Sequence, residues 1–329
     1  EQGMTKEEIF EFLKEQYCVG DKKAQIAYEI ACREKALLDQ LDCKNGYSLY
    51  AGIPFCPSIC SYCSFSSSPI AEWKDQVDCY LDAMIKELKA TAKLMQGKTL
   101  DTVYIGGGTP TTLEADQLDR LLGTIRENFD LEHVLEFTVE AGRPDSITKE
   151  KLEVLRRHQI SRISINPQTM QQKTLDCIGR KHTVEDIRQV YAMARELGFE
   201  NINMDLIAGL PGETLDDMKD TLRQIEMFAP DSLTVHALAM KRASRLTQEK
   251  REGSYRGNDQ ADSATMLSEM IELAAEYAGK MQLVPYYLYR QKNIAGNFEN
   301  VGYAEVDKAG IYNILIMEEK QTILAAGAG

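Results

Sequence analysis

The chain has 329 residues, of which 43% are hydrophobic and 27% are charged, as expected for a globular protein with a large core in one or two domains. Its formal net charge of −13 argues against a broad nucleic-acid-binding surface. No apolar run approaches the roughly 18–20 residues that cross a bilayer, and the acidic N-terminus does not resemble a secretory signal. We therefore expect a cytoplasmic protein with reduced cysteines. Because the chain starts at Glu1 and stops at "ILAAGAG", we also expect it to be a fragment of a longer protein.

Residues 1–46 contain no proline and predict a helical N-terminal segment. Thr5 and Glu8 have the spacing of a capping box ahead of a first helix. Apolar residues at helical spacing after Asp21 predict a second helix. We expect this segment to pack on the main domain.

Residues 47–280 alternate between predicted strands and helices. Short apolar runs predict strands at 48–53, 102–105, 135–140, 161–165, 202–209 and 233–238. Helices are expected between them, at 72–96, 112–128, 148–157, 183–197 and 214–228. This order indicates an α/β fold with parallel strands, as a doubly wound sheet or as a complete or partial barrel. Residues 281–329 form a C-terminal segment, which we expect to be incomplete.

Three cysteines follow the first predicted strand, in the pattern C-x3-C-x2-C. These are Cys56, Cys60 and Cys63. A structural zinc site normally takes four ligands, and a residue such as His182 or His236 could supply the fourth. An iron–sulfur cluster held by three thiolates would leave one iron open to a ligand. Simple packing is the third alternative. We expect most of the other cysteines to be buried thiols.

Further motifs lie at the ends of later strands. Gly106, Gly107 and Gly108 form a turn where a backbone can approach a ligand or make a tight strand-to-helix connection. Glu140 ends the third strand, and Asp205 interrupts the apolar fifth strand, where a buried acid needs a partner. Arg180 is a candidate for that partner. Because functional groups of β/α barrels gather at the carboxyl ends of the strands, five such segments favour a barrel over an open sheet.

The motifs "YAGIPFCPSICSYCSF", "YIGGGTPT", "NPQTM", "IGRKHT" and "NMDLIAGLPGET" together resemble those of the radical S-adenosylmethionine (SAM) enzymes. More narrowly, they resemble the oxygen-independent coproporphyrinogen III oxidase group, with its HemN, HemW and HemZ branches. The stretch at 285–304 resembles the HemZ branch. The resemblance implies a partial (β/α)6 barrel preceded by the helical segment.

The resemblance also implies two cofactors and their contacts. Cys56, Cys60 and Cys63 would hold a [4Fe–4S] cluster, whose open iron would bind SAM. The positions that match the family's SAM site are Tyr50, Tyr62, Gly107, Gly108, Thr109, Glu140, Gln168, Arg180, Asp205 and Ala239. The implied reaction is the oxidative decarboxylation of coproporphyrinogen III to protoporphyrinogen IX, with flavodoxin or ferredoxin as the electron donor.

The sequence departs from the decarboxylating HemN pattern in two places. Phe65 stands where that branch has a fourth cysteine, a feature shared with HemW, and "AGRPD" follows Glu140. A HemW-like heme chaperone and another radical reaction on a tetrapyrrole therefore remain alternatives. For the carboxylates and rings of a tetrapyrrole, we predict contacts from Lys241, Arg242, Tyr286, Tyr287, Tyr289, Arg290 and Lys292.

Overall fold

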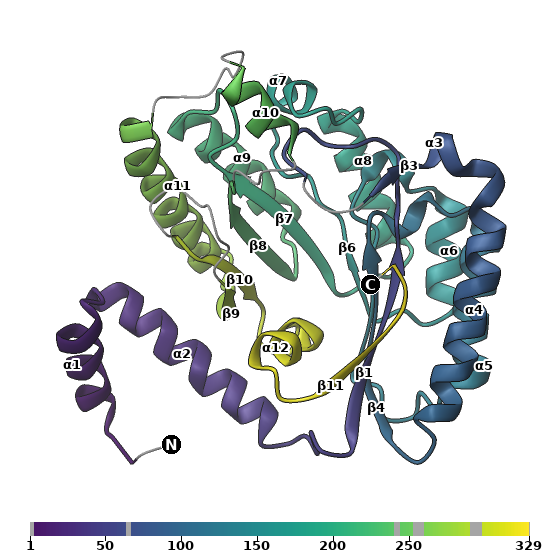
Figure 1. Cartoon of the computed structure of the whole chain (residues 1–329). Helices are drawn as coiled ribbons and strands as arrows, with labels where there is room; N and C mark the ends of the chain where they lie inside the picture. Colours follow the sequence, from purple (N-terminus) through teal and green to yellow (C-terminus); the bar gives the residue numbers. More distant parts are fainter. Residues whose placement is uncertain (1–2, 64–66, 240–243, 253–259, 290–297, 329) are drawn as a thin grey trace.

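The computed structural model describes residues 3–63, 67–239, 244–252, 260–289 and 298–328 (Figure 1). Two helices open the chain, α1 (Lys6–Tyr17) and α2 (Asp21–Leu38). The capping box of α1 is confirmed, because the Glu8 amide donates to Thr5 Oγ1 and the Thr5 amide donates to Glu8 Oε2. Arg33 on α2 donates to the carbonyl of Pro285 at 2.5 Å. The helical segment is thus attached to the C-terminal part of the chain.

Six parallel strands form the centre of the molecule and confirm the predicted α/β order. They are β1 (Gly46–Ile53), β4 (Thr99–Gly107), β5 (Glu136–Glu140), β6 (Arg162–Ser164), β7 (Ile202–Ala208) and β8 (Ser232–Ala237). Their side chains are almost all buried, as expected for a parallel sheet covered on both faces.

The C-terminal segment extends this sheet at both edges. Strand β11 (Thr322–Gly327) pairs in parallel with β1. At the other edge, β10 (Asn300–Ala304) runs antiparallel to β8, and β9 (Val284–Tyr289) runs antiparallel to β10. Across the described residues the strand order is β11-β1-β4-β5-β6-β7-β8-β10-β9.

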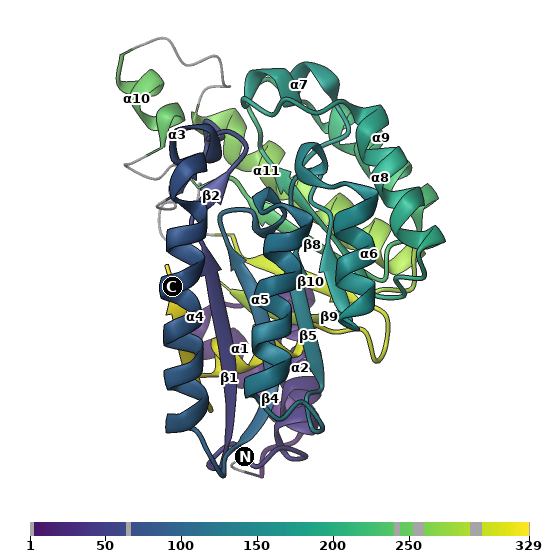
Figure 2. The same ribbon diagram turned by 90° about the vertical axis from the view of Figure 1, so that its right-hand side faces the viewer.

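Helices cover the outer face of the curved sheet, where Figure 2 shows α4, α5, α6, α8 and α9 in front of the strands. Their bounds are Val77–Leu94, Ala115–Asn128, Lys149–Arg157, Val184–Glu196 and Leu215–Phe228, close to the predicted ranges. The first predicted range is divided into α3 (Ile70–Trp73), a 3-10 turn (Lys74–Gln76) and α4. Three further helices are α7 (Gln172–Cys177), α10 (Arg245–Arg251) and α11 (Gln260–Lys280). No helix in the described ranges is both long and apolar enough to span a membrane.

A short helix, α12 (Ile311–Glu318), lies on the inner side of the sheet, between β11 and the β9–β10 pair (Figure 1). Its Tyr312 is 5% exposed and stacks on Tyr104 of β4 with ring centroids 4.4 Å apart. The ring of Tyr50 on β1 lies 6.3 Å from that of Tyr312. The inner face of the sheet is therefore filled near the middle by aromatic rings, and the space that remains open lies toward the carboxyl ends of the strands.

Candidate active site at the carboxyl ends of the strands

The three clustered cysteines lie on a loop that leaves β1 at the carboxyl end of the sheet. This loop begins with β2 (Phe55–Cys56), which pairs in parallel with β3 (Ser68–Pro69). The Thr109 hydroxyl donates to Cys56 Sγ at 3.5 Å, and the Cys63 amide donates to the carbonyl of Cys60 at 3.1 Å. Cys56, Cys60 and Cys63 all line one cavity. The loop thus presents three thiols to a common space.

The other cysteines do not have the burial that the sequence led us to expect. Cys18, Cys32, Cys79 and Cys177 are exposed, and Cys43 is half-buried. Cys18 caps α1, whereas the other three exposed residues lie on α2, α4 and α7, on sides that the core does not cover. The prediction of buried thiols is wrong for them.

The cavity has a volume of about 490 Å³, within the range of roughly 300–1,000 Å³ common for small-molecule sites. Besides the three cysteines, it is lined by nine of the ten residues predicted to contact SAM: Tyr62, Gly107, Gly108, Thr109, Glu140, Gln168, Arg180, Asp205 and Ala239. The tenth, Tyr50, does not line it and instead stacks on Tyr104 with centroids 6.1 Å apart. The structure thus brings together residues from six strand ends.

The glycine turn after β4 makes its closest approach to the chain's own backbone. Gly107 has φ +103°, a conformation that L side chains rarely adopt. The Gly108 amide donates to the carbonyl of Ile53 at 2.6 Å, and the Thr109 amide donates to that of Phe55 at 2.7 Å. A Cβ on Gly108 would lie 2.5 Å from the Phe55 oxygen. These glycines therefore hold β4 against the start of the cysteine loop.

Two carboxyl groups in the cavity differ in their electrostatic surroundings. Desolvation raises the pKa of Glu140 to about 7, although a hydrogen bond from the Tyr104 hydroxyl opposes the shift. Burial would also raise the pKa of Asp205, but interactions with His236 and Asn203 outweigh it and lower the pKa. The Asn203 amide donates to Asp205 Oδ1 at 2.7 Å, and His236 Nε2 lies 3.8 Å from Oδ2.

Arg180 is not the partner of Asp205, which corrects that prediction. Its guanidinium is buried and donates to the Asn166 carbonyl at 2.7 Å and to the Tyr62 hydroxyl at 3.0 Å. Arg180 is also not exposed to solvent, because its exposed fraction is 6%. The bonds to Asn166 and Tyr62 use its two terminal nitrogens, whereas Arg180 Nε is buried without a hydrogen-bond partner. Through Tyr62, the guanidinium contacts the loop that carries the cysteines.

Two cavity residues, Ser164 and Asn166, were not predicted as site residues, and they share an unusual feature with the predicted Gln168. In the described part of the chain, Ser164 Oγ, Asn166 Oδ1 and Gln168 Oε1 are buried and have no hydrogen-bond partner in the protein. All three line the cavity and occupy alternate positions along the chain, starting at Ser164, the last residue of β6. Buried polar atoms are normally paired, so they fit a polar ligand. This alternation of polar residues at a strand end was a signal in the sequence.

Of the three tyrosines on β9 that were predicted to contact a tetrapyrrole, two line the cavity and one does not. Tyr287 and Tyr289 line the space with parallel rings 6.0 Å apart, whereas Tyr286 packs behind them against Ala304 and Ile314. The hydroxyl oxygen of Tyr289 lies 3.0 Å from His236 Nδ1, within hydrogen-bond distance. Arg162, which the sequence did not suggest, is 1% exposed and adds a buried cation to the lining. Other predictions fall outside the described residues, namely Phe65, Lys241, Arg242, Arg290 and Lys292.

The donor set at the cysteine loop fits an iron–sulfur cluster better than a single ion. In the ranges that the structure describes, no three His, Cys, Asp or Glu side chains gather closely enough to hold one metal ion. His182 and His236 are therefore not placed to complete a zinc site with the cysteines. A cluster distributes its thiolate ligands over different irons, so its ligands need not converge on one point.

Comparisons with known proteins point to the same chemistry. The pattern of the radical SAM superfamily matches residues 50–225. The oxygen-independent coproporphyrinogen-III oxidase-like protein HemZ of Bacillus subtilis (strain 168) is 43% identical over 99% of this chain and 65% of its own length. The heme chaperone HemW of Lactococcus lactis is 34% identical over 70% of this chain and 59% of its own length. The chain thus spans less than two thirds of either relative.

A solved structure shows the same fold. It is coproporphyrinogen III oxidase (HemN) from Escherichia coli, described as a radical SAM enzyme. It superimposes with a TM-score of 0.67 over 89% of this chain and 66% of that one, at 24% sequence identity. The expected partial-barrel architecture is confirmed.

Proposed function

Because the chain belongs to the radical SAM superfamily, we propose that it catalyses a radical reaction on a tetrapyrrole. The reaction that we propose is the oxidative decarboxylation of coproporphyrinogen III. Membership of the superfamily implies a [4Fe–4S] cluster and SAM as cofactors. The observation that carries the proposal is the convergence of three cysteines, Glu140 and Asp205 on one cavity. The similarity to HemZ along 99% of the chain supports the choice of substrate.

We propose that Cys56, Cys60 and Cys63 hold the cluster and that the nine predicted residues lining the cavity contact SAM. When bound, the reduced cluster supplies the electron that cleaves SAM to methionine and a 5′-deoxyadenosyl radical, which takes a hydrogen atom from the substrate. Arg180 and the unpaired oxygens of Ser164, Asn166 and Gln168 offer hydrogen bonds to polar groups of SAM.

The substrate would lie toward β9 and α12. Arg162 and His236 offer hydrogen bonds to a carboxylate, and Tyr287 and Tyr289 offer ring faces to a pyrrole. Conversion of a propionate to a vinyl group removes one hydrogen atom, one electron and carbon dioxide. The reaction therefore requires a one-electron acceptor as well as an electron donor, for which we propose flavodoxin or ferredoxin. In this proposal, residues 47–280 bind the cofactors and contribute Arg162 and His236 to the substrate side, and residues 281–329 supply further substrate contacts.

The test is an anaerobic product analysis of reconstituted protein with SAM, a reductant and coproporphyrinogen III. We expect 5′-deoxyadenosine together with protoporphyrinogen IX. If 5′-deoxyadenosine forms without a porphyrinogen product, decarboxylation is refuted and the radical chemistry stands. A different tetrapyrrole mass would identify another radical reaction. One zinc and no iron, in place of about four irons per chain, would refute the cluster.

A second candidate function is heme binding and transfer, as in the HemW chaperones. It is supported by the similarity to HemW and by Phe65, the residue shared with that branch. The discriminating measurement is a heme titration of the holoprotein followed by transfer to an apo-acceptor. Stoichiometric binding and transfer, without turnover of SAM on a tetrapyrrole, would favour this function over catalysis.

A further inference from the structure

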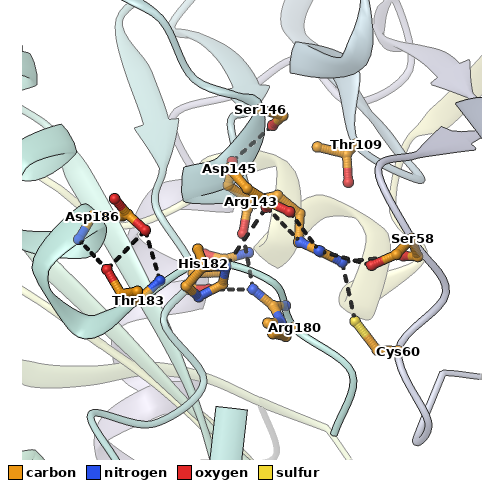
Figure 3. Close-up of polar contacts among 12 residues, drawn as sticks. Ser58, Cys60, Thr109, Arg143, Asp145, Ser146, Arg180, His182, Thr183 and Asp186 are labelled. Carbon is orange, nitrogen blue, oxygen red and sulfur yellow. Dashed lines mark hydrogen bonds and ion pairs between the residues drawn. The ribbon is translucent and has the colours of Figure 1, made fainter. Parts of the chain in front are cut away.

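Arg143 lies directly behind the cysteine loop, at the point where the chain leaves β5 (Figure 3). It is 3% exposed and lines the same cavity as the cysteines. Its Nη1 donates to Cys60 Sγ at 3.3 Å and to the carbonyl of Ser58 at 3.1 Å. Its Nη2 donates to Ser58 Oγ at 3.0 Å. One guanidinium thus holds the loop at two residues, one of them a cysteine.

Asp145 fixes the orientation of this guanidinium from the opposite side. Arg143 Nε donates to Asp145 Oδ1 at 3.0 Å, and Nη2 donates to Oδ2 at 2.8 Å, which is the bidentate geometry of a strong ion pair. Together with the bonds to the loop, these contacts match the five N–H donors of arginine. Nη1 is therefore directed at Cys60 Sγ by a fully bonded network. Figure 3 shows the buried His182 on the far side of Asp145.

We propose that Arg143 is a positioning residue for the iron–sulfur cluster, one that orients Cys60 and raises the cluster's reduction potential. Reduction adds negative charge to the cluster. A cation whose N–H donates to a ligating sulfur stabilises that more negative state, and outer hydrogen bonds of this kind tune metal centres. The inference rests on the proposed function, because it assumes that Cys60 is a ligand of the cluster.

Two substitutions separate the charge from the hydrogen-bond geometry. Arg143→Met removes both the charge and the donors but keeps a side chain of comparable length. Arg143→Lys keeps the charge but cannot reproduce the planar fork that satisfies Asp145 and the loop together. The matched control is Arg195→Met. Arg195 also pairs with a buried carboxylate, at 2.8 Å from Asp231 Oδ2, at the other end of the strands.

The experiment is a redox titration of the anaerobically reconstituted proteins without substrate, followed by electron paramagnetic resonance, with iron counted in each sample. We expect Arg143→Met to have a potential more negative than the wild type, Arg143→Lys to lie between them, and Arg195→Met to match the wild type. A wild-type potential in Arg143→Met with a full cluster would overturn the proposal.

If Arg143→Met does not assemble the cluster, the reduction potential of Arg143→Lys tests the proposal instead. A cluster potential in Arg143→Lys equal to that in Arg195→Met would overturn the proposal. A wild-type protein that binds no cluster would instead refute the proposed function. The potential is informative because a purely structural role for Arg143 would lower cluster content without shifting the potential of the clusters that form.

Discussion

The cysteine loop contains residues, such as Cys60, that we expect to bind the cofactor but to contribute little to the stability of the fold. Cys60 is buried at the cavity, but the main hydrophobic cluster, which joins the strands and the outer helices, does not include it, Cys56 or Cys63. Removing the thiol of Cys60 should therefore reduce binding of the cluster far more than it reduces the stability of the protein. Within this loop, backbone contacts such as that from the Ser61 amide to the Ile178 carbonyl do not involve the sulfur.

We predict that Cys60→Ala loses the cluster and the cleavage of SAM while keeping the fold. The measurements are iron content, 5′-deoxyadenosine formation and the far-ultraviolet circular dichroism spectrum. The control is Cys79→Ala, which removes an exposed thiol on α4 and should leave all three unchanged. If Cys60→Ala does not fold, the role of the loop is structural and the assignment is wrong.

Glu213 is a buried carboxyl group with a pH-dependent contribution to stability. It is 1% exposed, and the Thr169 hydroxyl donates to its Oε1 at 2.5 Å. Burial raises its pKa from 4.5 to about 7. Because the folded state holds this proton more tightly than the unfolded chain does, the stabilisation is complete below pH 4.5 and is lost as the pH rises through 7. At 1.36 kcal/mol per pH unit, the loss approaches about 3 kcal/mol.

We predict that Glu213→Gln reduces the loss of stability between pH 5 and pH 8. Because glutamine does not ionise, the free energy of unfolding of the variant should fall less over this interval than that of the wild type. Urea denaturation across the pH series measures the difference. The exposed Glu196→Gln is the control and should keep the wild-type slope, and a wild-type slope in Glu213→Gln would contradict the prediction.

At the scale of elements, the turn after β4 determines where the cysteine loop lies. Its amides at Gly108 and Thr109 bond to the backbone at Ile53 and Phe55, at the junction between β1 and β2. Such a close approach leaves no room for a Cβ at Gly108. The turn therefore transmits the position of β4 to the loop that carries the cysteines.

We predict that Gly108→Ala lowers the free energy of unfolding by about 1–3 kcal/mol, because backbone atoms must move to admit the methyl group. Urea denaturation measures this, and iron retention reports the displacement of the loop. The control is Gly279→Ala on α11, where a Cβ meets nothing within 4 Å. There alanine should stabilise the helix by roughly 0.5–1 kcal/mol. Equal effects at the two sites would show that the close approach is unimportant.

At the scale of the whole molecule, the C-terminal segment completes a fold that begins more than two hundred residues earlier. Strand β11 lies beside β1, and α12 inserts Tyr312 against Tyr104 on the inner face of the sheet. Tyr104 in turn donates a hydrogen bond to Glu140 in the cavity. The last part of the chain is thus packed against residues that support the proposed SAM site.

We predict that Tyr312→Ala lowers the free energy of unfolding by about 3 kcal/mol, because it leaves a cavity beside Tyr104. Urea denaturation provides the value. Tyr17→Ala is the control, since Tyr17 is 67% exposed and its loss should change stability by less than about 0.5 kcal/mol. Equal losses in the two variants would mean that α12 does not contribute to the core.

Sequence patterns alone predicted the order of the six central parallel strands from β1 to β8 and of the outer helices between them, the position of the motifs near strand ends and the superfamily, but not the C-terminal strands β9, β10 and β11. The predicted features are local, because apolar periodicity, capping residues and motif spacing are set by neighbours along the chain. Which side chains contact one another became clear from the three-dimensional fold. Arg180 bonds to Asn166 and Tyr62 and not to Asp205, and Arg143 reaches Cys60 across 83 residues. Such contacts depend on how the sheet curves, which no local pattern specifies.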